Sequence, residues 1–244
     1  MNSTFDQPIA LITGGARRLG RAIALGLAKE GYAIGLHYHR SIIEAEAVAA
    51  EIEEVGTKAI LIQADLTKPA EIEKLFRQIS GTKSRLEVLV NSAAVMRPGR
   101  LGEDTPAAWD DTFALNLRAP WLCGQLAFER MRESGGVIIN ISDAGSNRPW
   151  TGYAAYILSK SALETLTRLQ AKEYAPKVRV NALAPGLIIP SEDIPEQTWE
   201  KLNARLPLQI SEREESIIQA VVFLIRNEYI TGEVIAVDGG YRLI

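Results

Sequence analysis

The chain has 244 residues, of which 47% are hydrophobic and 23% charged, and these values are those of a folded globular protein rather than a disordered or fibrous one. Its net charge of −3 argues against nucleic acid or an anionic membrane as a partner. The single cysteine, Cys123, excludes an intrachain disulfide, and the two histidines argue against a multi-histidine metal site.

Short apolar runs alternate with longer helical patterns along the chain. Strands are expected at 9–13, 33–38, 58–63, 86–91, 136–141, 178–182 and 233–237. Helices are expected at 17–31, 42–55, 69–79, 105–132, 152–174 and 211–225, the fourth as one long helix or two abutting helices with a kink at Pro120. The chain has no run of about 18 apolar residues and no signal-peptide pattern at its N-terminus, so a cytoplasmic protein is expected.

Nearly continuous apolar strands separated by helices predict a parallel sheet that is covered on both faces. We therefore expect an α/β protein with a single Rossmann-fold domain over residues 1–244, a doubly wound sheet of seven strands. Ligands of such folds bind outside the carboxyl ends of the strands. Candidate binding residues are consequently those that directly follow each strand.

A glycine-rich turn follows the first strand, in the sequence Thr13-Gly-Gly-Ala-Arg-Arg-Leu-Gly20. Glycines at a strand-to-helix turn let the backbone approach a phosphate, and the helix N-terminus supplies free N–H groups. The turn therefore predicts a dinucleotide site that includes Gly14, Arg18, Leu19 and Gly20. A tight turn without a ligand is the alternative.

The end of the second strand indicates which dinucleotide binds. NAD sites carry an acidic residue there, whereas this chain has His37-Tyr-His-Arg-Ser41. Arg40 offers a guanidinium fork, Ser41 a hydroxyl and His37 a ring donor for a phosphate, with Tyr38 and His39 in the same segment. Arg18 can face the same region. This favours NADP(H), with a solvated basic turn as the alternative.

Later strand ends complete the expected cofactor site. Asp65 and Leu66 follow the third strand, where an adenine edge can lie. Small residues follow the fourth strand and suit a flat ring near the backbone, and a Pro-Gly pair follows the sixth; these residues are Asn91, Ser92, Ala93, Pro185 and Gly186.

Tyr156 and Lys160 are four residues apart, which places both on one face of a helix. A free tyrosine has a pKa of about 10 and is a poor acid at neutral pH. A neighbouring lysine cation favours the phenolate, so we expect Lys160 to lower the pKa of Tyr156. Taken alone, such a pair also occurs by chance on solvated helices.

Together these motifs resemble the short-chain dehydrogenase/reductase family over essentially the whole chain. The matching positions also include Asn116 and the segment from Thr231 to Gly240. The resemblance implies that Tyr156 is the general acid and that Lys160 lowers its pKa and holds the nicotinamide ribose. It also implies that Asn116 carries a water-linked proton relay.

Two departures from the common family pattern resemble the pteridine reductase branch, which uses NADPH. Arg18 stands where the family usually has glycine, and Asp143 where it usually has serine, thirteen positions before Tyr156. A carboxylate would repel an alcoholate and raise the pKa of Tyr156, but it suits a ring nitrogen that needs a proton. Asp143 is therefore expected to be catalytic, with an incidental turn residue as the alternative. Two segments also resemble that branch: Gly152-Tyr153 and Ile194-Pro…Trp199-Glu200.

The substrate is expected beside Arg18, Asp143 and Tyr156, under a loop or lid with a short helix at about 187–210 that begins with Leu187. In the pteridine reductase branch a phenylalanine stacks on the pterin, and Met96 takes its place here. Ala94 replaces a serine of that branch, and Trp150 could supply another aromatic wall.

The first interpretation is an NADPH-dependent reductase of a C=N or C=O bond, with a pterin-like heterocycle as substrate. Alternatives are a carbonyl reductase or alcohol dehydrogenase with an unrelated substrate, and a non-catalytic NADP(H)-binding sensor. A reductase of a carrier-linked acyl chain is disfavoured because the family's serine is absent. The resemblance also implies a homotetramer formed through helices 105–132 and 152–174.

Overall fold

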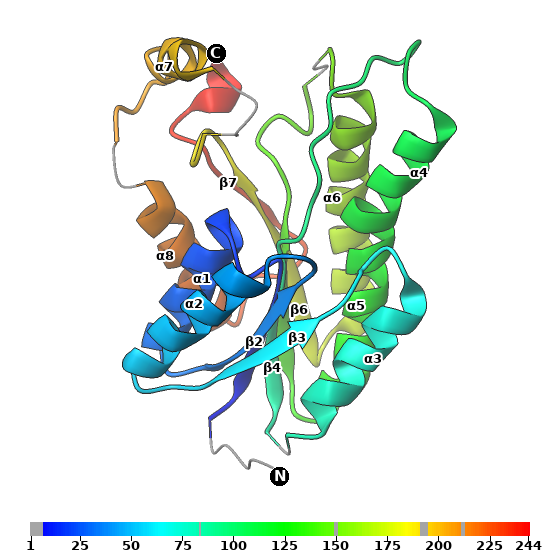
Figure 1. Cartoon of the computed structure of the whole chain (residues 1–244), viewed down its shortest axis with the longest axis vertical. Helices are drawn as coiled ribbons and strands as arrows, with labels where there is room; N and C mark the ends of the chain where they lie inside the picture. The colour runs from blue at the N-terminus through cyan, green and yellow to red at the C-terminus, as the bar shows by residue number, and fades with distance from the viewer. Residues whose placement is uncertain (1–6, 83, 149–150, 191–194, 211–212) are drawn as a thin grey trace.

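The computed structural model describes residues 7–82, 84–148, 151–190, 195–210 and 213–244. Seven strands form one sheet in the order β3-β2-β1-β4-β5-β6-β7, and every neighbouring pair is parallel. Helices cover both faces of this sheet (Figure 1). The predicted doubly wound Rossmann fold is therefore confirmed.

The strands keep close to their predicted positions. They are β1 (Ile9–Thr13), β2 (Ala33–Tyr38), β3 (Ala59–Gln63), β4 (Leu86–Asn91), β5 (Gly136–Ile141), β6 (Val178–Pro185) and β7 (Val234–Val237). The α-helices are α1 (Arg18–Lys29), α2 (Ile42–Glu54), α3 (Pro69–Ser80), α4 (Pro106–Phe113), α5 (Ala119–Met131), α6 (Ala154–Tyr174), α7 (Glu196–Asn203) and α8 (Arg213–Arg226). A π-helical turn, Ala114–Arg118, joins α4 to α5, and a 3₁₀ turn follows β7 at Tyr241–Leu243.

Alternate side chains along the strands pack into two hydrophobic cores, one on each face of the sheet. Ala10 and Ile12 of β1 lie in the core shared with α1, α2 and α8, whereas Ile9 and Leu11 lie in the core shared with α3 and α5. Both sets are fully buried. Because each strand is apolar on both faces, the sheet is held between two helical layers (Figure 1).

Of the two possibilities predicted for 105–132, two abutting helices are closer to the structure than one long helix. This segment divides into α4, the π-helical turn and α5. Pro120 has no N–H group and cannot donate to the carbonyl of Asn116 four residues earlier, so α-helical bonding is interrupted there. The widened turn places Asn116 inside the protein at 1% exposure.

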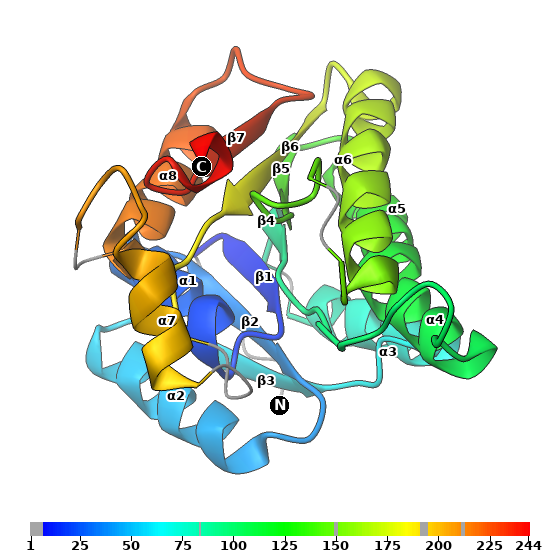
Figure 2. The same ribbon diagram turned by 90° about the horizontal axis from the view of Figure 1, so that it is seen from above.

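The order of the sheet reverses between β1 and β4, since β2 and β3 extend to one side and β5 to β7 to the other. Crevices at such reversals are where doubly wound folds bind ligands. Seen from above, α7 and the start of α6 lie on opposite sides of this region (Figure 2). Within the residues described, every helix is too short or too polar to span a bilayer.

Candidate active site

A cavity of about 840 Å³ opens at the carboxyl ends of β1, β2, β4, β5 and β6. Nineteen residues expected from the sequence lie on its wall: Gly14, Arg18, Leu19, Gly20, His37, His39, Arg40, Ser41, Asp65, Leu66, Ser92, Ala93, Met96, Asp143, Tyr156, Lys160, Pro185, Gly186 and Leu187. The fold thus brings together segments that are up to about 170 residues apart in the chain.

The glycine turn fits the phosphates of a dinucleotide. Gly14 has a φ of +66°, a conformation that favours glycine. A Cβ atom on Gly20 would lie only 2.1 Å from the carbonyl oxygen of Gly14, so no side chain fits between the turn and α1. The first turn of α1 carries no acidic residue, and its N–H groups and dipole favour an anion.

His37 does not have the role expected from the sequence. Its ring is 2% exposed, and Nδ1 accepts a hydrogen bond of 2.9 Å from the N–H of Gly14. Nδ1 is therefore unprotonated, so Nε2 carries the proton and donates to the carbonyl of Ala64 at 3.0 Å. Burial lowers the pKa of His37 to about 4, which keeps the ring neutral. His37 braces the glycine turn and has no ring donor left for a phosphate.

The remaining side chains at the end of β2 are divided. His39, Arg40 and Ser41 lie on the cavity wall. His39 and Arg40 are also exposed, so their side chains can reach a phosphate at the edge of the cavity. Tyr38 is 8% exposed and packs in the core with α1 and α2 instead. Arg17 is a further cation on the cavity wall near this segment, and it was not selected from the sequence.

Asp65 lies on the wall after β3. Its Oδ1 atom accepts hydrogen bonds from the N–H and the hydroxyl of Thr67, at 3.0 and 2.7 Å. Burial acts to raise the pKa of Asp65, but these bonds and Lys68 outweigh it and lower the pKa to about 2. The carboxylate is therefore ionised, and it orders the turn that places Leu66 and Thr67 at the cavity.

Two predicted asparagines lie behind the wall rather than on it. The side-chain amide of Asn91 donates to Oδ1 of Asn140 at 2.8 Å, within the sheet. Oδ1 of Asn116 accepts from the N–H of Val95, and its amide donates to the carbonyl of Val95 and to the hydroxyl of Ser159, all within 3.1 Å. The side chain of Asn116 thus fixes the segment after β4, and only its backbone is left for a relay.

Asp143, Tyr156 and Lys160 meet at the end of β5. The hydroxyl of Tyr156 donates a hydrogen bond of 2.7 Å to Oδ2 of Asp143, while the N–H of Gly145 donates to Oδ1 at 2.6 Å. The ammonium group of Lys160 donates to the carbonyl of Ile141 at 2.6 Å and lies 5.9 Å from the centre of the Tyr156 ring. The carboxyl, the phenol and the ammonium therefore form one cluster on the cavity wall.

The expected lowering of the pKa of Tyr156 is wrong for this arrangement. Burial and the carboxylate of Asp143 raise the pKa of Tyr156 well above its usual value. Burial also raises the pKa of Asp143, and it lowers the pKa of Lys160 to about 8. Because burial disfavours every charged form, the pKa values of the phenol and the carboxyl lie above their usual values, and that of the ammonium lies below.

Arg18 connects the glycine turn to the segment after β6. Its φ of +51° lies in the left-handed region, and its guanidinium donates to the carbonyls of Ile189 and Pro190 at 3.0 and 2.8 Å. At the other end of the predicted lid, Arg213 donates to the carbonyl of Leu187 at 2.8 Å. The lid region 187–210 contains α7, a short helix as expected.

Sequence reasoning missed several residues of the wall and left one untested. Trp199 of α7 faces the cavity, although it had been selected only as a mark of the resemblance. Trp150 lies outside the described residues. The other missed residues are Arg17, Thr67, Ala94, Val95, Arg97, Asp111, Leu115, Ile141, Ser142, Ile188 and Ile189, of which Ala94 had been named only as a replacement.

Comparison with known proteins assigns the family. A family profile described as "Enoyl-(Acyl carrier protein) reductase" matches residues 14–242. The 3-oxoacyl-[acyl-carrier-protein] reductase FabG of Staphylococcus aureus is 35% identical over 237 residues, which cover 95% of this chain and 96% of the relative. The chain belongs to the short-chain dehydrogenase/reductase family. It is accordingly an oxidoreductase.

Two further relatives bear on the cofactor and the substrate. Pteridine reductase 1 of Leishmania tarentolae is 34% identical and covers the whole of this chain and 99% of the relative. The structure of FolM, an alternative dihydrofolate reductase 1 from Brucella canis, contains NADP; it is 35% identical with a TM-score of 0.92, covering 97% of this chain and 94% of that one. The prediction of NADP(H) as cofactor is confirmed by the family match and by this NADP-bound relative.

Proposed function

We propose that this chain is an NADPH-dependent reductase of a C=N bond in a pterin-like heterocycle. The observation that carries the proposal is the hydrogen bond of 2.7 Å between the hydroxyl of Tyr156 and the carboxyl of Asp143 on the cavity wall. Similarity to pteridine reductase 1 and to FolM supports the same substrate class.

NADPH, when bound, supplies the hydride. The chain's own residues supply protons and position. Burial favours the protonated form of Asp143, so its carboxyl can donate a proton to a ring nitrogen as the adjacent carbon is reduced. The phenol of Tyr156 holds Oδ2 of this carboxyl in place, and the N–H of Gly145 holds Oδ1.

The charge of the site favours an imine over a ketone. Reduction of a ketone develops negative charge on oxygen, and the carboxyl of Asp143 would repel that charge if it were ionised. Reduction of an imine needs a proton on nitrogen, which a buried carboxyl can supply. Trp199 and Met96 add flat and apolar surface to the wall where a planar ring would lie.

The second candidate is a reductase of a ketone, in particular of a 3-oxoacyl group. Its support is the 35% identity to FabG over 95% of this chain. This candidate gives Asp143 no chemical role, and the cluster around Asp143 is the observation against it. A non-catalytic sensor would bind NADPH and turn over neither class.

A substrate panel tests these candidates. Initial rates of NADPH oxidation are measured with dihydrobiopterin and dihydrofolate, and in parallel with a 3-oxoacyl thioester, a quinone and simple ketones. The proposal expects kcat/KM to be highest for the reduced pterins, and Tyr156→Phe, which removes the hydrogen bond that holds Oδ2 of Asp143, to lower it by roughly ten- to hundredfold. A preference for the thioester, or NADPH binding without turnover of any substrate, contradicts the proposal.

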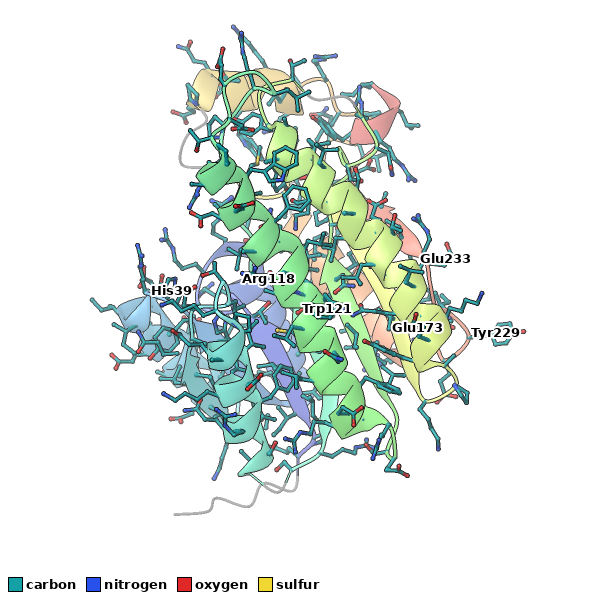
Figure 3. The ribbon with its side chains drawn as sticks, turned by 90° about the vertical axis from the view of Figure 1, so that its right-hand side faces the viewer. His39, Arg118, Trp121, Glu173, Tyr229 and Glu233 are labelled. Carbon is teal, nitrogen blue, oxygen red and sulfur yellow. The ribbon has the colours of Figure 1, made fainter. Side chains whose placement is uncertain are left out.

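We further propose that the protein is a homotetramer, and that the outer face of α4, α5 and α6 forms one of its contacts. Trp121 and Leu169 are 47% and 54% exposed there, and Trp109, Phe113 and Leu166 line the same hollow. Figure 3 shows Trp121 on the outer side of α5. Light scattering after size-exclusion chromatography measures the mass, and Trp121→Glu is expected to reduce it. A wild-type monomer contradicts this proposal.

A further inference from the structure

Helix α6 presents three polar side chains to the segment after β5. Tyr156, Lys160 and Glu164 follow one another at intervals of four residues and so share one face of the helix. Tyr156 donates to Asp143, and Lys160 donates to the carbonyl that ends β5. Glu164 is the third member of this row and has no part in the chemistry described above.

The carboxylate of Glu164 gathers the residues that flank Asp143. Oε1 accepts hydrogen bonds from the hydroxyl of Ser142, at 2.9 Å, and from the hydroxyl of Ser146. Oε2 accepts from the side-chain amide of Asn147 at 3.1 Å. Glu164 is 2% exposed, and these three partners carry no charge. These three hydrogen bonds satisfy both oxygens of the buried carboxylate.

We infer that Glu164 is a positioning residue for the reaction: it fixes the turn that carries Asp143 against α6, and its carboxylate acts on Asp143 through charge as well as geometry. This inference rests on the proposed role of Asp143 as proton donor. The carboxylate of Glu164 then has two effects on Asp143, one geometric and one electrostatic. One variant that removes the charge and another that loosens the turn can separate these two effects.

The surroundings of Asp143 agree with this assignment. Burial raises the pKa of Asp143, and Glu164 adds to that rise. Tyr156, the N–H of Gly145 and Lys160 act in the opposite direction. Tyr156, Lys160 and Glu164 all come from α6, so this row acts on the proton affinity of Asp143 together with burial and the N–H of Gly145.

Other elements packed near Asp143 contribute fewer ionisable groups. On the β6 side the N–H of Ala144 donates to the carbonyl of Pro185 at 2.9 Å, a neutral contact. Across the cavity, Arg18, Arg97 and Asp111 lie on the same wall. Their charges act equally on the wild-type protein and on a Glu164 variant, so they cancel in the comparison.

Glu164→Gln removes the charge and keeps the shape, since the serine hydroxyls and the amide of Asn147 can each reverse their donor and acceptor roles. In the cofactor-free protein, the carboxyl signal of ¹³C-labelled aspartate, assigned with Asp143→Asn, reports the titration of Asp143. We expect its midpoint to fall by roughly half to one pH unit. The limb where heterocycle reduction declines with rising pH should move by the same amount, so the rate there falls about three- to tenfold.

Ser161→Ala is the matched control. The hydroxyl of Ser161 donates to the carbonyl of Ser146, so its loss loosens the same turn without changing a charge. We expect Ser161→Ala to change kcat or KM while leaving the pH limb and the titration midpoint in place. If Glu164→Gln does not fold, Ser146→Ala replaces it. This variant removes one hydrogen-bond donor from Glu164, so the negative charge of Glu164 is less neutralised and the titration midpoint of Asp143 should rise.

Two results overturn the inference: a titration midpoint of Asp143 that is the same in wild type and Glu164→Gln, or an equal shift in Ser161→Ala. Failure of the proposed function is a different result. In that case the wild-type protein would not turn over heterocycles. The titration midpoint of Asp143 would still show whether Glu164 acts on it.

Discussion

The buried neutral ring of His37 makes the stability of this protein sensitive to acid. The pKa of His37 is about 4 in the folded protein and about 6.5 in the unfolded chain. Above pH 6.5 both states are neutral, so the full stability is present. As the pH falls, the unfolded chain takes up a proton that the folded protein cannot bind. The free energy of unfolding then drops by up to about 1.4 kcal/mol per pH unit.

Over the window from pH 6.5 to pH 4, His37 accounts for a loss of about 3 kcal/mol. For a chain of this size that corresponds to a fall in Tm of about 6 to 12 °C. Thermal unfolding is followed between pH 7 and pH 4 in the wild type and in His37→Gln, whose amide can replace both hydrogen bonds. The variant should lose the part of the acid sensitivity that is due to His37.

His39→Gln is the matched control, because His39 is exposed and is the only other histidine. The charge of His39 is only the smallest cause of the low pKa of His37, so His39→Gln should follow the wild-type curve closely. The raised pKa of Asp143 has the opposite effect on stability, but it is present in all three proteins and cancels in the comparison. Parallel curves for the wild type and His37→Gln would refute the assignment of His37 as a neutral brace of the glycine turn.

Two further predictions concern the cofactor end of the cavity. Arg40→Asp should weaken NADPH binding by about ten- to hundredfold and NADH binding much less, measured by nucleotide fluorescence; equal losses would remove the phosphate role of Arg40. Gly20→Ala should abolish NADPH binding and lower Tm, since its Cβ would lie 2.1 Å from the carbonyl of Gly14, whereas Gly102→Ala, with open space around it, should leave both unchanged. Normal NADPH binding by Gly20→Ala would contradict the role of the tight turn.

The sequence was a good guide to the strands because each is a short apolar run, and most of the strands are buried on both faces. β1 and β4 have the bounds that were predicted, and every residue of β1 is buried. The helix predicted at 105–132 was less accurate. Its apolar pattern runs through α4 and α5 without a break, and only Pro120 signals the interruption that turns Asn116 inward.

The cavity was predicted well where residues follow a strand, since parallel strands end at one edge of the sheet. His37 shows the limit of that reasoning. Leu36 and Tyr38 point into the core with α1, so alternation turns His37 to the opposite face. There it lies beneath Gly14 and beside Ala64, and nothing in the local sequence tells a brace from a phosphate ligand.

Protonation in the cluster was predictable only in part: the sequence indicated that Asp143 raises the pKa of Tyr156, as it does, but also that Lys160 would lower it. The interval between Asp143 and Tyr156 correctly suggested a contact. It did not reveal that both groups are buried, and burial together with this contact reverses the direction that Lys160 led us to expect for the pKa of Tyr156. Glu164 was missed as well, although its spacing from Lys160 was a signal, because a third residue on a helix face has no meaning until its partners are known.

The central claim is that the carboxyl of Asp143 supplies the proton for reduction of a heterocycle. The most direct measurement is the ratio of kcat/KM for dihydrobiopterin to that for a ketone, in the wild type and in Asp143→Ser. Loss of a positioned acid costs about a hundredfold or more, so the ratio should fall by at least that factor while ketone reduction is retained or improved. An unchanged ratio would contradict the account.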